Sequence, residues 1–270
     1  MAGREVHIPY CGTPPDPGQL LHRWNLDPVL ITILGGLWLA YALGARRAGV
    51  VSGRRNLFHV GWGLTAAALI SPICPLSVSL FSARVGQHMV LTLLAAPLVA
   101  AGRPVLALRA LSGMGPAAPA PSVGKRAMLA AGLFWALLWY WHVPGPYEAT
   151  FESTLVYWTM HLTLYGSALL LWSALLEGGR GQPAWTIGAG LVSTVQMGLL
   201  GALITLAPQA VYGPHFLTTA AWGLTPLQDQ ELGGAIMWVP GCVAFLGAAM
   251  IELGALLSEP AALRRGALAG

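Results

Sequence analysis

Residues 155–176 read LVYWTMHLTLYGSALLLWSALL and contain no Asp, Glu, Lys or Arg. The hydrocarbon core of a bilayer is about 30 Å thick, and an α-helix of roughly 17–25 mainly apolar residues crosses it. The stretch has that length and composition. It therefore predicts a helix that spans a membrane.

Six more apolar stretches accompany this one, and the whole composition agrees with them. Charged residues make up 9% of the chain and the mean hydropathy is +0.64, whereas roughly a quarter of the residues in a soluble domain are charged. Lipid cannot hydrogen-bond backbone groups, and the alternation typical of a β-barrel is absent, so each stretch should be a helix. The expected spans are Pro28–Gly44, Leu57–Ile73, Val85–Ala101, Ala127–Trp141, Leu155–Leu176, Ala184–Leu206 and Leu232–Leu257.

The predicted fold is an all-α integral membrane protein, a bundle of seven transmembrane helices. The membrane domain should cover residues 28–257, with an extracytoplasmic tail at 1–27 and a cytoplasmic tail at 258–270. The sequence contains no internal repeat that would indicate a second unit. The alanine- and proline-rich stretch Ser112–Ser122 is expected to be an irregular connector.

Basic residues are divided unequally between the two sides of this bundle. The positive-inside rule assigns the richer side to the cytoplasm, so the N-terminus should lie outside and the C-terminus inside. The first 27 residues lack the apolar core of a cleaved signal peptide. The pI of about 9.2 fits contact with anionic lipid headgroups and gives no support for nucleic-acid binding. Arg46, Arg47, Arg54, Arg55, Arg103, Arg109, Lys125, Arg126, Arg180, Arg264 and Arg265 fall on the inner side, and Arg4, Arg23 and Arg84 on the outer side.

Six of the seven histidines fall on the predicted outer side. His88, His142 and His161 lie near the outer ends of three different spans, at depths where they could converge. Imidazole is a common metal ligand, and an ionisable residue inside a membrane indicates a functional site. The alternative is structural, because a histidine near a helix end also hydrogen-bonds neighbouring carbonyls. His7, His22 and His215 are weaker candidates, and His59 is expected at the inner interface.

Sulfur-containing residues bear on which metal such a site would take. Met237, about six residues into the last span, is the best methionine candidate, since thioether with imidazole suits Cu(I). Methionine is also ordinary packing material. Cys11 and Cys74 both lie on the oxidising side, where they could pair or offer thiolates to copper.

Enzyme signatures are missing from the sequence. It contains no GxSxG, Walker A, dinucleotide-binding or HExxH motif, so we expect a protein that is not an enzyme. A transporter would need polar residues along its path, and the inner half of the spans offers little beyond Glu252.

Three segments resemble the CtaG-type cytochrome c oxidase assembly proteins. They are Trp141-His142-Val143-Pro144, the run Trp222–Gln230 with Gly233-Gly234 and Met237-Trp238 after it, and Gln87-His88 leading to Gly102-Arg103-Pro104. The resemblance extends over roughly residues 26–257. It implies a factor in the inner (cytoplasmic) membrane that helps a haem–copper oxidase mature, with oxidase subunits, the lipid bilayer and copper chaperones as partners. At the outer face, His88, His142 and His161, with Asp229 and Met237 nearby, would hold copper transiently or dock the oxidase.

The chain departs from that family at one position of interest. The family's third helix commonly opens with His-Met-x-x-His, and here Arg84 and Val85 replace the first two residues of the pattern. Two other functions stay open, a haem- or quinone-binding electron carrier and a copper transporter. Haem needs facing histidines deep in a bundle, and the span histidines all lie near one surface, which favours copper. Asp229 is expected to open the last helix, where its charge suits the helix dipole.

Overall fold

The computed structural model describes residues 8–115, 122–177 and 183–258, and every regular element within these ranges is a helix. The described residues therefore confirm the all-α class. In chain order the elements are η1 (Pro17–His22), α1 (Pro28–Arg47), α2 (Ser52–Ile70), α3 (Ile73–Ser79), α4 (Phe81–Met89), the π-helical segment η2 (Val90–Ala95), α5 (Ala96–Ala101), α6 (Pro104–Leu111), α7 (Val123–His142), α8 (Pro144–Glu152), α9 (Thr154–Leu175), α10 (Pro183–Thr205), η3 (Gly213–His215), η4 (Thr219–Trp222) and α11 (Pro226–Ser258).

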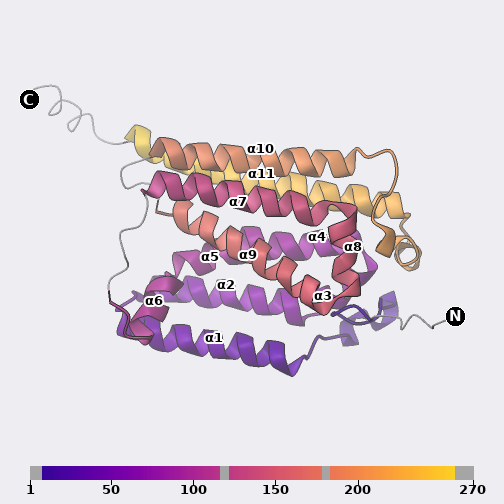
Figure 1. Ribbon diagram of the computed structural model, residues 1–270, viewed down its shortest axis with the longest axis horizontal. Helices are drawn as coiled ribbons and strands as arrows, with labels where there is room; N and C mark the ends of the chain where they lie inside the picture. The colour runs from indigo at the N-terminus through magenta and orange to yellow at the C-terminus, as the bar shows by residue number, and fades with distance from the viewer. Residues whose placement is uncertain (1–7, 116–121, 178–182, 259–270) are drawn as a thin grey trace, which may run out of the picture.

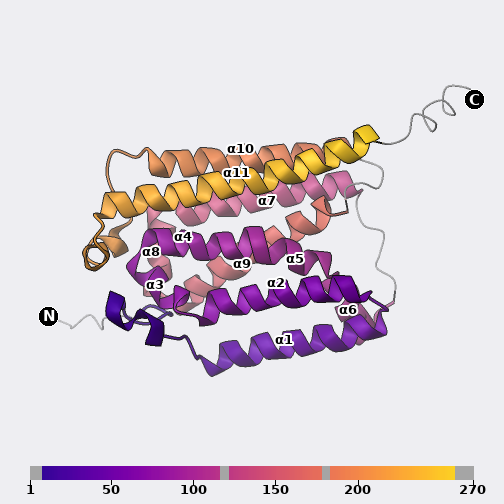
Figure 2. The same cartoon turned by 180° about the vertical axis from the view of Figure 1, so that it is seen from behind.

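The long helices run roughly parallel to one axis of the molecule (Figures 1 and 2). Helices α1 and α2 form one side, α4, α5 and α9 lie in the middle, and α7, α10 and α11 form the other side. Helix α9 crosses the middle obliquely. The bundle therefore has two ends. The chain enters α1 at one end and leaves α11 at the other (Figure 1).

Several of these helices are long and apolar enough to cross a membrane, which supports a multi-pass membrane protein. Four qualify alone: α1, the continuous helix Phe81–Ala101, α10 and α11. Two bent pairs, α2 with α3 and α7 with α8, raise the number among the described residues to six. Helix α9 coincides with the remaining expected span and has 22 residues, but it is not among the helices that qualify. The count of seven spans stays a prediction.

Prolines account for both bends. The residue before a proline is restricted to extended conformations, so a helix commonly ends there. Ser71 before Pro72 has ψ 172° and Val143 before Pro144 has ψ 133°. The resulting bends are 47° between α2 and α3 and 74° between α7 and α8. Helix α8 consequently turns across the end of the bundle.

The expected span Val85–Ala101 begins earlier than the sequence indicated, at Phe81, and contains the π-helical segment Val90–Ala95. Pro97 follows this segment and cannot donate a backbone hydrogen bond, so the preceding turn must change its pattern. One carbonyl in that turn, of Thr92, accepts a hydrogen bond from Trp172 Nε1 at 2.8 Å. Segments of this kind often lie beside functional sites.

The Thr-Pro-Leu-Gln-Asp-Gln run is the start of α11 and has a structural role. Thr225 and Gln228 form a reciprocal capping box: Gln228 N donates to Thr225 Oγ1 at 3.2 Å, and Thr225 N donates to Gln228 Oε1 at 2.9 Å. Pro226 occupies the first turn, where its missing N–H costs nothing.

Asp229 lies in the first turn of α11, as expected, but its carboxylate does not accept from the N–H groups of that helix. Its carboxylate instead accepts from the start of α4: from Phe81 N at 2.6 Å, Ser82 N at 3.1 Å and Ser82 Oγ at 2.5 Å. Leu80, the residue that precedes α4, has no capping side chain. Asp229 therefore satisfies the free N–H groups of a neighbouring helix, and it is fully buried there.

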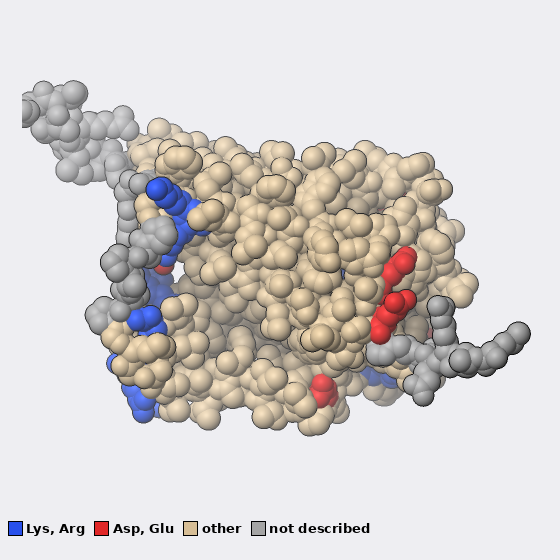
Figure 3. Space-filling model, viewed as in Figure 1, with Lys and Arg blue, Asp and Glu red and all other residues tan. Residues whose placement is uncertain are grey.

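Charges gather at the two ends of the bundle (Figure 3). Lys and Arg lie mainly at the end where α1 finishes, here called the arginine end, and Asp and Glu mark the opposite end. The opposite end holds His88, His142 and His161 and is here called the histidine end. The expected basic residues Arg4, Arg180, Arg264 and Arg265, and part of the Ser112–Ser122 connector, lie outside the described residues.

Candidate functional site

Two of the predicted histidines meet inside the bundle. His88 and His161 each lie seven residues after the first residue of their helices, α4 and α9, so they reach the same depth. Their ring centroids are 5.1 Å apart, in an edge-to-face arrangement. Both side chains are buried. We call these two residues the histidine pair.

The ring of His161 is oriented by its own helix. Its Nδ1 lies 3.0 Å from the carbonyl oxygen of Tyr157, one turn earlier. A carbonyl can only accept, so Nδ1 carries the proton and Nε2 presents a lone pair. The Nε2 atoms of both His161 and His88 are buried and have no hydrogen-bond partner among the described residues. The pair thus presents two buried ring nitrogens that no described residue hydrogen-bonds.

A buried arginine stands beside the pair. Arg84, one turn before His88 on α4, is only 2% exposed. It donates to Thr150 Oγ1 at 2.6 Å, and its guanidinium carbon lies 4.3, 5.1 and 5.7 Å from the ring centroids of Phe151, Tyr147 and Tyr157. The one ion pair within the described ranges is at the arginine end. Arg84 therefore keeps its charge among aromatic faces, without a carboxylate.

Residues four apart on three helices build this site. Arg84 and His88 lie on α4, Tyr147 and Phe151 on α8, and Tyr157 and His161 on α9. Such pairs share one helix face, and the 74° bend after α7 turns the α8 pair toward the other two.

The sequence interpretation had counted Arg84 among residues outside the spans, and this was wrong, since Arg84 lies within α4. The sequence signal that would have placed Arg84 in the span is its position one helical turn before a histidine, at the start of an apolar stretch.

His142 is among the electrostatic neighbours of His88, but the histidine ring contact does not include it. It is the last residue of α7, and its Nδ1 lies 2.7 Å from Leu138 O of the same helix. Of the three histidines expected to converge, the ring contact joins His88 of α4 to His161 of α9. Within the described ranges, no group of three or more His, Cys, Asp or Glu side chains is arranged to hold a metal ion.

The remaining candidates have other surroundings. Met237 is fully buried in the main hydrophobic cluster. His215 Nε2 lies 2.6 Å from the Tyr147 hydroxyl, and burial lowers the pKa of His215 to about 3. His22 is exposed, and His59, on α2, accepts a hydrogen bond from Trp38 at 3.1 Å. His7 lies outside the described residues.

The N-terminal segment closes the histidine end. A disulfide joins Cys11 to Cys74, with their Cα atoms 5.4 Å apart, so the two cysteines pair. Next to it, Tyr10 stacks on Tyr157 with centroids 4.9 Å apart, and Tyr157 in turn lies 4.2 Å from the His161 ring. The tail is thus connected to the histidine pair through two aromatic rings.

Comparison with protein-family models gives one match. Residues 36–258 match the cytochrome c oxidase caa3 assembly factor model, which covers most of the chain and includes every residue of the histidine pair and its arginine. Comparisons with curated proteins and with solved structures gave no match.

Proposed function

This chain belongs to the cytochrome c oxidase caa3 assembly factor family, and we propose that it helps a haem–copper oxidase mature by holding copper transiently at the histidine pair. The role is non-enzymatic: the residues bind and release an ion and dock the oxidase subunits that receive it. Copper is here the cargo, and His88 and His161 are the residues that hold it.

One observation carries this proposal, the two buried Nε2 atoms without a protein partner. Leaving a buried acceptor unsatisfied costs free energy, so such atoms call for a partner that the chain does not supply. Histidine ligands in metal sites generally use their other ring nitrogen on a backbone carbonyl, as His161 does on Tyr157. Neutral imidazoles suit copper far better than Mg²⁺ or Ca²⁺.

Arg84 fits a transient site better than a permanent one. A fixed positive charge beside the pair, among the electrostatic neighbours of His88, opposes a bound cation. The affinity for copper is thereby lowered and release to a client is favoured. His142, Met237 and Asp229 stay predicted ligands of the same ion, and the proposal does not require them.

The experiment is a Cu(I) titration of the purified full chain against a competing chelator. His88→Ala and His161→Ala should each lower copper affinity at least about tenfold, because each removes one of two ligands. His59→Ala, at the other end of the bundle, should leave it unchanged. His142→Ala should have a smaller effect than either pair variant, because the His142 ring makes no ring contact with His88 or His161 among the described residues.

Oxidase maturation is the second readout. In a host that lacks its own copy, the wild-type chain and His59→Ala should restore oxidase activity, and the two pair variants should not. Unaltered copper affinity and full maturation with the His88→Ala/His161→Ala double variant would overturn the proposal. A Soret absorption band in the purified protein would favour the haem-binding alternative instead.

The histidine end faces the outside of the cytoplasmic membrane in this proposal. The arginine end carries Arg46, Arg47, Arg54 and Arg55 and, by the positive-inside rule, lies in the cytoplasm. Copper chaperones and oxidase subunits would then approach the histidine end. The disulfide between Cys11 and Cys74 at that end supports the same orientation, because disulfides persist in oxidising compartments.

A further inference from the structure

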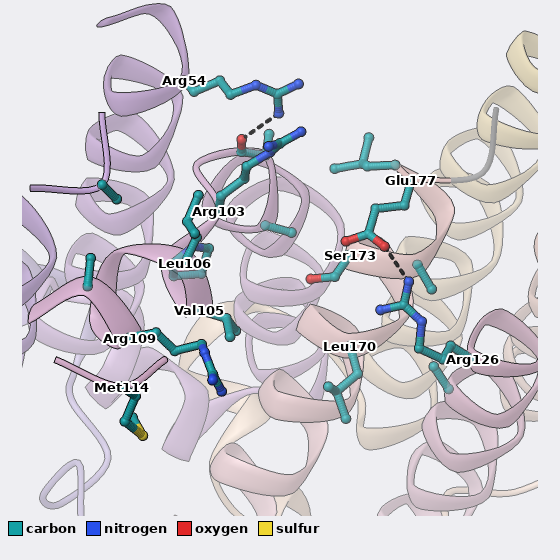
Figure 4. A pocket seen from close by; sticks show the side chains of 18 of the residues that line it. Arg54, Arg103, Val105, Leu106, Arg109, Met114, Arg126, Leu170, Ser173 and Glu177 are labelled. Atoms are coloured by element: carbon teal, nitrogen blue, oxygen red, sulfur yellow. Dashed lines mark hydrogen bonds and ion pairs between the residues drawn. The ribbon is translucent and has the colours of Figure 1, made fainter. Parts of the chain in front are cut away.

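A cavity lies at the opposite end of the bundle from the histidine pair. It has a volume of about 1000 Å³ and opens between α6 on one side and the ends of α7 and α9 on the other (Figure 4). Figure 3 shows the hollow near the arginine end. The proposed handling of copper does not involve it.

The cavity wall is apolar. Leu106 of α6, Leu129 and Leu133 of α7, and Leu170 of α9 line it, and each of these side chains is exposed. They leave a surface that suits hydrocarbon.

The rim, in contrast, is cationic. Arg54, Arg103, Arg109 and Arg126 line the cavity, and Glu177 is the one carboxylate among its lining residues. Glu177 pairs with Arg126. Among the described residues, Arg54, Arg103 and Arg109 thus have no ionic partner, which leaves an excess of positive charge at the level where the helices end.

Two of these three arginines donate to backbone carbonyls with only some of their N–H groups, and the third donates to no described residue. Arg54 donates to the Ala101 carbonyl at 3.0 Å, and Arg109 donates to the Gly115 carbonyl. No described residue accepts from the Arg103 guanidinium. Arg103 also adopts a left-handed conformation, with φ 55° and ψ 55°. Non-glycine residues rarely adopt it, and such strain gathers at binding sites.

We propose that this cavity binds one anionic phospholipid. The phosphodiester would lie at Arg103, with Arg54 and Arg109 on either side, and the acyl chains would cover the leucines of the wall. A ligand with a negative head and an apolar body matches both surfaces, whereas free phosphate would match only the arginines of the rim. Basic pockets between membrane helices bind anionic headgroups through the same chemistry.

The test is native mass spectrometry of the full chain in detergent, with phosphatidylglycerol and phosphatidylcholine of identical acyl chains. The unmodified protein should bind phosphatidylglycerol about tenfold more tightly or better, since it presents several unpaired arginines to one negative charge. Arg103→Gln/Arg109→Gln should abolish this preference. Arg46→Gln is the matched control, because Arg46 is exposed at the same end and does not line the cavity.

Three results would overturn the inference. Equal binding of the two lipids by the unmodified chain is one, and this measurement needs no variant to fold. An undiminished preference in Arg103→Gln/Arg109→Gln is the second. Displacement of the lipid by millimolar inorganic phosphate is the third, because it would identify a site for a soluble anion.

Discussion

Arg84 places a positive charge one turn from His88, on the same helix. Its removal should therefore strengthen copper binding. Arg84→Gln removes the charge and should raise Cu(I) affinity about tenfold, the order expected for a unit charge relieved in a partly screened site. Arg84→His removes the charge and adds an imidazole, so it should raise the affinity further.

Chelator competition measures both variants, and thermal unfolding verifies that the loss of the Thr150 hydrogen bond and the aromatic contacts is tolerated. Weaker copper binding in a folded Arg84→Gln protein would show that the guanidinium supports the site, contrary to its proposed repulsion.

Asp229 illustrates how a residue with a metal ligand's chemistry can be explained by helix capping. Asp229→Ala leaves the N–H groups of Phe81 and Ser82 buried without acceptors, which should cost about 2 kcal/mol of stability. Asp229→Asn keeps one acceptor oxygen and should cost less. Thermal unfolding in detergent compares the two. Full stability with poor oxidase maturation in both variants would instead favour a functional carboxylate.

The sequence supplied the histidines of the pair but not their pairing. His88 and His161 were recognisable because ionisable residues are rare in apolar stretches. Which of three histidines meet depends on where helices begin and how they pack, and the start of α4 at Phe81 depends on Asp229, 148 residues away in the chain. No local pattern carries that information.

At the scale of helices, the seven apolar stretches all fall on helices of the structure, because apolar length is a local property. The bends were harder to predict from the sequence. Prolines at 72 and 144 marked them, but the 74° turn that brings Tyr147 and Phe151 over Arg84 depends on the partners that α8 meets at the end of the bundle.

Glycines set the spacing of α10 and α11. A Cβ on Gly234 would lie 2.3 Å from Thr205 Oγ1 and 2.8 Å from the Gly201 carbonyl oxygen, so the two backbones must separate to admit it. Gly234→Ala should destabilise the protein by about 1–3 kcal/mol.

Gly247, in the same helix, is the matched control, because its Cβ would meet no atom within 4 Å. Gly247→Ala should leave the thermal midpoint unchanged or raise it. A Gly234→Ala midpoint equal to that of the unmodified protein would refute the close-contact explanation.

At the scale of the whole molecule, the two ends have opposite chemistry and seven passes connect them in the predicted topology. The chain enters α1 at the histidine end and leaves α11 at the arginine end (Figure 1), and an odd number of crossings is needed to connect opposite faces of a membrane. The four qualifying helices and the two bent pairs give six crossings, which is an even number. Helix α9 has the required length, with Tyr157, His161 and Tyr165 among its residues, and we predict that it is the seventh crossing.

Its polar and aromatic residues face the bundle: Tyr165 shares a hydrogen bond of 2.7 Å with Thr65, and His161 contacts His88. A helix surrounded by other helices can carry such residues inside a membrane, because protein rather than lipid surrounds them. Its modest hydropathy is therefore compatible with a span.

Reporter fusions test the number of crossings and the orientation together. Reporters joined after Gly113 and after Gly270 should be active only in forms that work in the cytoplasm, and a reporter inserted at Gly223 only in a form that works outside it. Seven crossings with the arginine end inside require this pattern. If the chain crossed six times and its N-terminus lay outside, the reporters at Gly223 and Gly270 would not lie on the sides predicted for them. An externally active reporter after Gly270 would reverse the assignment and would remove the histidine pair from the compartment where the proposed copper transfer takes place.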